Sequence, residues 1–230
     1  MSNINICAQD AYLALYPQSK KPVGVNWPDE GKSREQALAT SGYLGLLLGP
    51  KSDVMDVDLD CREAKGLAEL ILPKPFAQFD RGTSDSGHYL YKATTCGPTK
   101  KFSGNGSKST LVELRGDGSQ TMIPPSIHPD GSRLNFTDIN QDAPEIEYAD
   151  LLKSVSLLAA CSEVAQLWVS GRRHELALTF SGLCLKQNVD PQLLINIIQR
   201  ICQTPGDRDE QDRMNCVSTS VGKPPDDLRG

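Results

Sequence analysis

The chain has 230 residues, of which 38% are hydrophobic and 23% charged, a composition typical of a globular protein with one large core and room for a smaller second domain. No apolar run approaches the roughly 20 residues needed to cross a bilayer, and residues 1–4 lack the features of a secretion signal. We therefore expect a cytoplasmic protein with no membrane association. The net charge of −5 gives no overall attraction for a polyanion, but basic residues cluster locally and leave DNA contact open.

The cysteines do not form a recognisable metal or disulfide pattern. There are seven of them, and no two are close enough to make a Cys-x-x-Cys pair. The spacing argues against a zinc ribbon, and the odd number in a cytoplasmic protein argues against a disulfide framework. We expect mainly buried apolar thiols and no zinc.

Short elements occupy the first third of the chain. Residues 7–16 space apolar side chains as a helix does, and residues 33–39 begin with a capping pattern that predicts a second helix. Residues 43–48 and 54–59 are two extended runs whose connection is short enough for an antiparallel hairpin. A further helix is predicted over residues 62–72, which is followed by prolines.

The middle of the chain favours strands, and its last third favours helices. The expected strands are residues 88–92, 110–115, 120–123 and 133–136. The polar and basic stretch 97–109 is expected to be a mobile loop. The expected helices are residues 145–160, 172–187, 190–203 and 207–217.

The change from strands to helices predicts two domains, residues 1–150 and residues 151–230. The tail 222–230 has the composition of a linker, and we expect the chain to continue into further regions.

Two carboxylates stand two residues apart in an apolar strand. Because side chains two apart on a strand share a face, Asp56 and Asp58 project together while Met55 and Val57 point to the other side. Like charges at this spacing repel unless a cation neutralises them, and a divalent metal with oxygen ligands is suited to the position. The alternative is a pair of acids on the solvent face of an edge strand, which is the commoner meaning of an isolated Asp-x-Asp.

Two later segments add polar groups of the same kind. Ser86 and His88 lie where a glycine-containing turn enters a strand, and both side chains can donate to an anion. Glu113 and Arg115 share one face of their strand, so that Glu113 can complete a metal site and Arg115 can reach phosphate. The competing interpretations are a turn serine with a surface histidine, and a simple ion pair.

A rigid loop follows the strands, with Ser126 and His128 between prolines. Both side chains can contact a nucleotide, although such a loop is more often only a fixed connection.

In chain order, the segments VDLD, SGHYLY, VELRGDG and IPPSIHPDG resemble the prim-pol branch of the archaeo-eukaryotic primase superfamily, found in plasmid and phage replication proteins. That family has an Asp-x-Asp or Asp-x-Glu motif, then a Ser-x-His motif, then a single acid after apolar residues, then a Pro-Pro-Ser-x-His-x-x-Gly loop. The stretches KKPVGVNWP and GRRHELALTFSGLCLKQNV extend the resemblance to roughly residues 20–220.

The resemblance implies an α+β fold, in which a mixed or antiparallel sheet flanked by helices is followed by a small all-helical segment. It implies a nucleotidyltransferase, a DNA primase/polymerase that makes primers or extends DNA in plasmid, phage or mobile-element replication. The implied partners are a single-stranded DNA template, a primer, dNTP or NTP, and a helicase domain or partner.

The resemblance also assigns residues. It implies that two Mg²⁺ or Mn²⁺ ions are bound by Asp56, Asp58 and Glu113, and that the incoming triphosphate is held by Ser86 and His88. The further nucleotide-binding candidates are Arg115, Lys101, Lys108 and His128, and the DNA-binding candidates are Arg172 and Arg173. The family commonly has Asp where this chain has Glu113, which leaves the choice between the two metals open.

Three alternatives remain. A phosphate-binding loop could end at residues 31–33, but Asn26 stands in place of its first glycine. An Asp-x-Asp pair also suits a glycosyltransferase that binds a sugar nucleotide through Mn²⁺, although this leaves the Ser-x-His segment unexplained. The third alternative is a catalytically inactive replication-initiation or single-strand-binding module.

Overall fold

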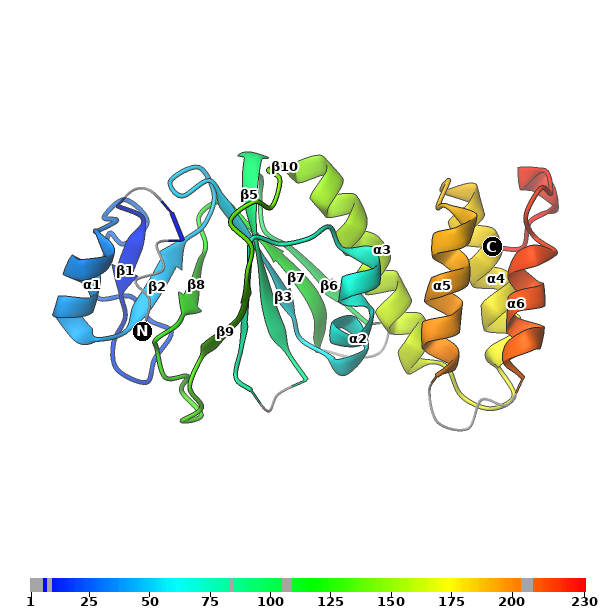
Figure 1. Cartoon of the computed structure of the whole chain (residues 1–230), viewed down its shortest axis with the longest axis horizontal. Coiled ribbons are helices and arrows are strands. Elements are labelled where there is room, and N and C mark those ends of the chain that lie inside the picture. Colours follow the sequence, from blue (N-terminus) through cyan, green and yellow to red (C-terminus); the bar gives the residue numbers. More distant parts are fainter. Residues whose placement is uncertain (1–5, 8–9, 83–84, 105–108, 204–208) are drawn as a thin grey trace.

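The protein contains two β-sheets followed by a run of helices (Figure 1). The computed structural model describes residues 6–7, 10–82, 85–104, 109–203 and 209–230. The smaller sheet has the strand order β1 (Tyr12–Ala14), β2 (Leu44–Leu47) and β8 (Gln120–Ile123). The larger sheet has the order β6 (Lys100–Ser103), β7 (Thr110–Arg115), β3 (Val54–Leu59), β5 (Gly87–Thr95), β4 (Ala77–Asp80) and β9 (Asn135–Ile139).

One short strand makes the larger sheet mixed. β10 (Ile146–Glu147) pairs with β5 in parallel, whereas the pairs along the main strand order are antiparallel. The helices are α1 (Arg34–Ser41), α2 (Arg62–Ile71), α3 (Tyr148–Gln166), α4 (Arg173–Lys186), α5 (Pro191–Cys202) and α6 (Glu210–Ser218). The predicted α+β class, with a sheet followed by a helical segment, is therefore confirmed.

Strand β3 lies in the middle of the larger sheet and separates its apolar face from its polar face. Met55, Val57 and Leu59 are fully buried in the main hydrophobic cluster. The alternate residues Asp56 and Asp58 point to the opposite face, as the period of two requires. The apolar face thus packs in the core, and the face that carries the carboxylates is available for a functional site.

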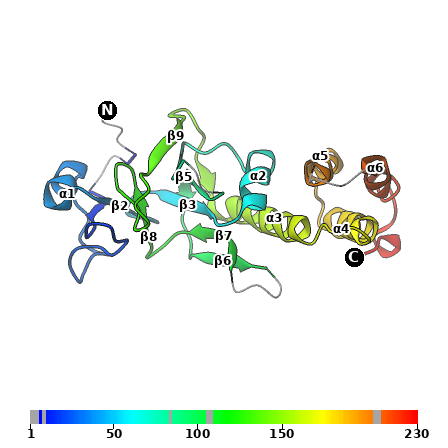
Figure 2. The ribbon, with the colours of Figure 1, turned by 90° about the horizontal axis from the view of Figure 1, so that it is seen from below.

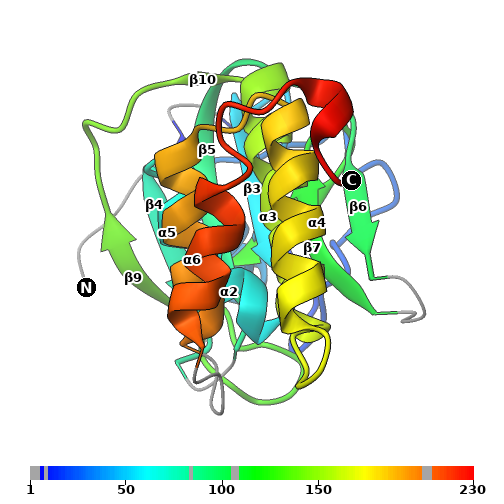
Figure 3. The same ribbon diagram turned by 90° about the vertical axis from the view of Figure 1, so that its right-hand side faces the viewer.

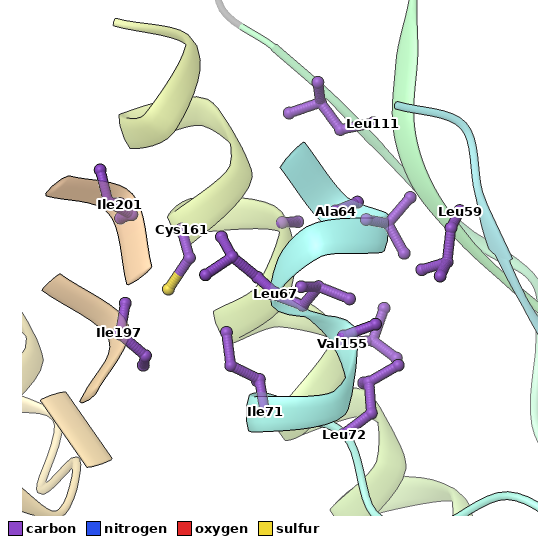
Figure 4. Packing of buried hydrophobic residues seen from close by; sticks show 14 of the residues in the cluster. Leu59, Ala64, Leu67, Ile71, Leu72, Leu111, Val155, Cys161, Ile197 and Ile201 are labelled. Atoms are coloured by element: carbon purple, nitrogen blue, oxygen red, sulfur yellow. The ribbon is translucent and has the colours of Figure 1, made fainter. Parts of the chain in front are cut away.

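Helices α2 and α3 cover the apolar face of the larger sheet. Figure 4 shows Leu67 of α2 beside Val155 and Cys161 of α3, with Ile197 of α5 farther out in the same cluster. Leu67 is only 3% exposed, and burial of a side chain of this size stabilises the fold by about 2 kcal/mol. One continuous hydrophobic cluster therefore runs from the sheet through α2 and α3 to α5.

The remaining helices extend the molecule away from the sheets. Figure 2 shows the smaller sheet, the larger sheet and helices α4 to α6 following one another along the length of the molecule. In Figure 3, α4, α5 and α6 stand in front of the sheet. Asp190 caps the N-terminus of α5, because its carboxylate accepts a hydrogen bond from the backbone N–H of Leu193 at 2.8 Å. No helix in the described part of the chain is long and apolar enough to cross a membrane.

The prediction of a first helix over residues 7–16 is wrong where the chain is described. Tyr12–Ala14 form strand β1, and all three side chains are buried. The strand pairs antiparallel with β2, with Tyr12 opposite Leu46. A short apolar run fits a buried strand as well as a helix, and pairing with β2 decides between them.

The predicted hairpin of residues 43–48 and 54–59 is also wrong. Both runs are strands, but β2 pairs with β1 and β8, whereas β3 pairs with β5 and β7. They meet at a single bridge between Gly49 and Val54. Gly49 has φ 90°, and a Cβ there would lie 2.9 Å from the Cα of Asp117. A glycine thus lets the chain pass from one sheet to the other.

The other elements mostly match their predicted positions. The stretch 97–109, expected to be a loop, contains strand β6, which pairs with β7, and residues 105–108 lie outside the described part. Strand β4 was not predicted. The four late helices are present with shifted ends, and the predicted boundary near residue 150 falls inside α3. The assignment of two domains stays a prediction.

Candidate functional site

The polar face of the larger sheet carries one row of side chains across five strands. In the antiparallel register, Asp58 on β3 lies opposite His88 on β5 and opposite Glu113 on β7. Phe79 on β4 follows beyond His88, and Lys101 on β6 follows beyond Glu113. Residues that are far apart in the chain therefore become direct neighbours because the strands pair in this register.

Two cations hold the acids of this row together. The guanidinium of Arg115 places its Nη2 2.5 Å from Oδ2 of Asp58 and donates from Nε to Oε2 of Glu113 at 3.1 Å. Lys101 Nζ lies 3.3 Å from Oε1 of the same glutamate. Asp58 and Glu113 are buried, with 4% and 6% exposure, so their charges depend on these partners.

His88 stands between the two predicted aspartates. Its Nδ1 lies 3.0 Å from Oδ2 of Asp56 and its Nε2 lies 3.6 Å from Oδ1 of Asp58. The imidazole stacks on the ring of Phe79, with ring centroids 4.5 Å apart. Burial favours the neutral imidazole, but the charges of Asp56 and Asp58 outweigh it and raise the pKa of His88 above its usual value. His88 is therefore held in place as a donor.

Asp56 has a different setting from the other acids. Its side chain has no exposure to solvent, and His88 engages both of its oxygens. Burial alone would raise the pKa of Asp56, but His88 and Arg115 lower it, so the carboxylate is ionised. In this arrangement Asp56 orients the imidazole, and its predicted role as a metal ligand stays a prediction.

Asp60 is a further acid that the sequence interpretation missed. One carboxylate oxygen each from Asp58, Asp60 and Glu113 lie within 4.8 Å of one another, a spacing that a single cation can bridge. Desolvation, followed by the charge of Asp58, raises the pKa of Asp60 to about 6. The signal was present in the sequence, because Asp60 continues the alternation begun by Asp56 and Asp58.

A pocket opens over this row, between the larger sheet and strand β8 with the loop that follows it. It is a shallow space of about 520 Å³ when the open solvent at its mouth is included. Besides Asp58 and Asp60, its polar lining comprises Lys20, Asp80, Arg81, Ser86, His88, Arg115, Gln120, Thr121 and His128. Acidic and basic side chains thus line the same space.

Ser86 is positioned by basic neighbours that the sequence did not identify. Arg81 donates to the hydroxyl of Ser86 at 2.8 Å and forms an ion pair with Asp130 at 2.6 Å. Lys65 donates to the backbone carbonyl of Ser86 at 3.1 Å and pairs with Asp80 at 2.9 Å. Their place beside the site depends on the packing of α2 and β4 against β5, which the sequence does not reveal.

The other predicted residues have mixed outcomes. His128 lines the pocket, and its Nδ1 lies 3.0 Å from Asp130. Ser126 is buried, with its hydroxyl bonded to the backbone of Leu44, so it fixes the loop and does not face the pocket. Lys108 lies outside the described residues.

The two arginines predicted to touch DNA belong to the helical segment. Arg172 directly precedes α4, and Arg173 is its first residue and donates to the carbonyl of Trp168 at 3.4 Å. Neither lines the pocket.

Three acids at ligand distance from one another, two of them lining a pocket that also contains several basic groups, form a candidate metal site. A family model described as bifunctional DNA primase/polymerase, N-terminal (Prim-Pol), matches residues 8–148. Because the match spans more than half of the chain, the chain belongs to the Prim-Pol family and is a nucleotidyltransferase of the primase/polymerase type. A comparison with curated proteins finds no matching relative.

Proposed function

We propose that this chain joins nucleotides on a single-stranded DNA template by a two-metal mechanism, starting or extending DNA strands. The observation that carries the proposal is the juxtaposition of Asp58 and Glu113 on paired strands, with Asp60 at the end of the same strand as Asp58. The family match supports the reaction class, and the row of side chains supports its location.

The donor set fits a divalent cation. Carboxylate oxygens from Asp58, Asp60 and Glu113 are hard ligands of the kind that Mg²⁺ and Mn²⁺ take, and one oxygen from each residue lies within 4.8 Å of the others. When bound, the metal ions would lower the charge of the triphosphate and favour attack by the primer hydroxyl. Asp56 is the predicted fourth ligand, available once His88 no longer engages it.

Arg115 and Lys101, which pair with the acids of the row, have two roles in this proposal. Without a divalent ion, Arg115 and Lys101 neutralise the buried carboxylates. With a metal ion on those carboxylates, both side chains would be available to bind the negative charge of a nucleotide. The same two side chains would therefore neutralise the acids in the metal-free protein and bind the nucleotide when metal is present.

The hydroxyl and basic groups of the pocket are proposed to hold the triphosphate. His88 and Ser86 were predicted for this role, and Arg81 and Lys20 join them in the lining. Arg81 reaches Ser86 directly, so a phosphate that binds the hydroxyl also meets the guanidinium. His128, which lines the same pocket, is a further proposed contact.

The template and primer are proposed to reach this pocket from outside the sheet. Arg172 and Arg173 are proposed DNA contacts in the helical segment, which we assign to residues 151–230. A place in plasmid, phage or mobile-element replication, and a helicase domain or partner, follow from the resemblance to replication proteins of that kind.

A template extension assay tests the proposal. A primed template is incubated with either dNTP or NTP in Mg²⁺ or Mn²⁺, and a second reaction without primer measures initiation. We expect metal-dependent extension by the parent chain and its loss in Asp56→Ala and Asp58→Ala. Absence of extension by the folded parent in both metals would refute the proposal, and turnover of a UDP-sugar would favour a glycosyltransferase.

A further inference from the structure

The helical segment contains a second cluster of metal-ligating groups, distinct from Asp58, Asp60 and Glu113 on the larger sheet. His174 lies on α4, and Asp212 and Cys216 lie one helical turn apart on α6. One ligand atom from each residue lies within 4.8 Å of the others. The cluster joins two helices, and no part of the proposed polymerase mechanism uses it.

The contacts within the cluster converge on one nitrogen atom. Nδ1 of His174 lies 2.8 Å from Oδ2 of Asp212 and 3.7 Å from Sγ of Cys216. This nitrogen carries at most one hydrogen, so it can donate to only one of the two neighbours. A cation placed among the three atoms would interact favourably with all of them at once. Arg213 also pairs with Oδ2 of Asp212, the oxygen that contacts His174, so a cation at the cluster would share this carboxylate with the guanidinium.

The ligand types point to zinc. One nitrogen, one sulfur and one carboxylate oxygen form the mixed set that Zn²⁺ accepts, whereas Mg²⁺ prefers oxygen ligands. The set is also open on one side, because the side chains of His174 and Asp212 are 53% and 43% exposed while Cys216 is buried. A water molecule can therefore supply a fourth ligand.

The composition of α6 gives a structural reason for such a link. The helix has only nine residues, and its buried side chains are Arg213, Cys216 and Val217. Two apolar side chains contribute little to the docking of a helix, and a helix this short is marginal without tertiary contacts. A metal that joins α4 to α6 would supply the missing stabilisation.

We propose that His174, Asp212 and Cys216 form a zinc site that fastens α6 to α4 in the helical segment. On binding, Cys216 coordinates as the thiolate and its proton passes to the solvent. The proposal departs from the expectation of no zinc, which considered only cysteines close together in the chain. It is independent of the proposed polymerase activity.

Cobalt substitution tests the site directly. The whole chain carrying Asp58→Asn and Glu113→Gln, which weaken metal binding at the acids of the sheet, is loaded with Co²⁺, and excess metal is removed. We expect about one bound ion and a thiolate-to-cobalt charge-transfer band. The band should disappear in Cys216→Ser and persist in Cys184→Ser, a matched control because Cys184 is also buried, at 3% exposure, and lies on α4.

Two further variants address folding and geometry. His174→Gln and Asp212→Asn alter half-exposed side chains, and each should weaken Zn²⁺ binding at least about tenfold while the helical content is retained. Zn²⁺ should raise the thermal midpoint of the parent and not that of Cys216→Ser. Absence of the band in the parent, or its persistence in Cys216→Ser, would overturn the proposal, as would unchanged Zn²⁺ affinity in both His174→Gln and Asp212→Asn.

Discussion

Replacement of Arg115 by Gln should destabilise the metal-free protein strongly. The guanidinium contacts both Asp58 and Glu113, and all three side chains are largely buried, with exposures of 19%, 6% and 8%. Removal of one member of a buried charge group leaves the others uncompensated, at a cost of about 3 kcal/mol or more. The equilibrium between folded and unfolded protein should therefore shift by about a hundredfold.

Mg²⁺ should restore most of this loss, because a divalent ion can replace the guanidinium between the two carboxylates. A ligand that binds only the folded state at a hundred times its dissociation constant stabilises by about 2.7 kcal/mol. The free energy of unfolding is measured by urea titration, for the parent and for Arg115→Gln, in EDTA and in Mg²⁺. Mg²⁺ should stabilise the variant more than the parent, in which Arg115 competes for the acids.

The control is Arg229→Gln, which removes an arginine from its ion pair with Glu175. Both side chains of this pair are exposed, at 60% for Arg229 and 67% for Glu175. Exposed pairs contribute at most about 1 kcal/mol, and no response to Mg²⁺ is expected. An equal loss of stability for Arg115→Gln in EDTA and in Mg²⁺ would refute the idea that Arg115 occupies the place of a metal.

Three further changes probe the site and the fold. His88→Ala removes the donor that stacks on Phe79, and steady-state kinetics should show a higher KM for nucleotide and a slower kcat. Gly49→Ala forces a Cβ to within 2.9 Å of the Cα of Asp117 at φ 90°, and denaturant titration should show a loss of more than about 1 kcal/mol. Asp190→Ala removes the N-cap of α5, which should cost about 1 kcal/mol and lower the thermal midpoint by a few degrees.

The chemistry of the row was predictable from the sequence, but its geometry was not. Alternation along a strand shows that Asp56 and Asp58 share one face of their strand. It shows in the same way that Glu113 and Arg115 share one face of theirs. Which strands are neighbours depends on tertiary packing, so the position of Glu113 directly opposite Asp58 follows only from the structure. Asp60 was overlooked because it follows the last residue of the strand.

The basic residues that line the pocket could not be predicted from the sequence either. Arg81 follows strand β4, which has no clear pattern in the sequence, and Lys20 comes from a loop after β1. Gln120 donates to the backbone carbonyl of Lys20 at 2.8 Å across a hundred residues of chain. Contacts of this range carry no local signal, which is also why the short strand β1 was taken for a helix.

In the proposed function, the side chains around Asp58 perform nucleotidyl transfer. Single-turnover addition of one nucleotide to a primed template measures this step for the parent, for Asp58→Asn and for Asp53→Asn, an exposed acid just before the same strand. Metal ligation contributes several kcal/mol to the transition state, so Asp58→Asn should be slower by about a thousandfold and Asp53→Asn nearly unchanged. Equal rates for the parent and Asp58→Asn would contradict the account.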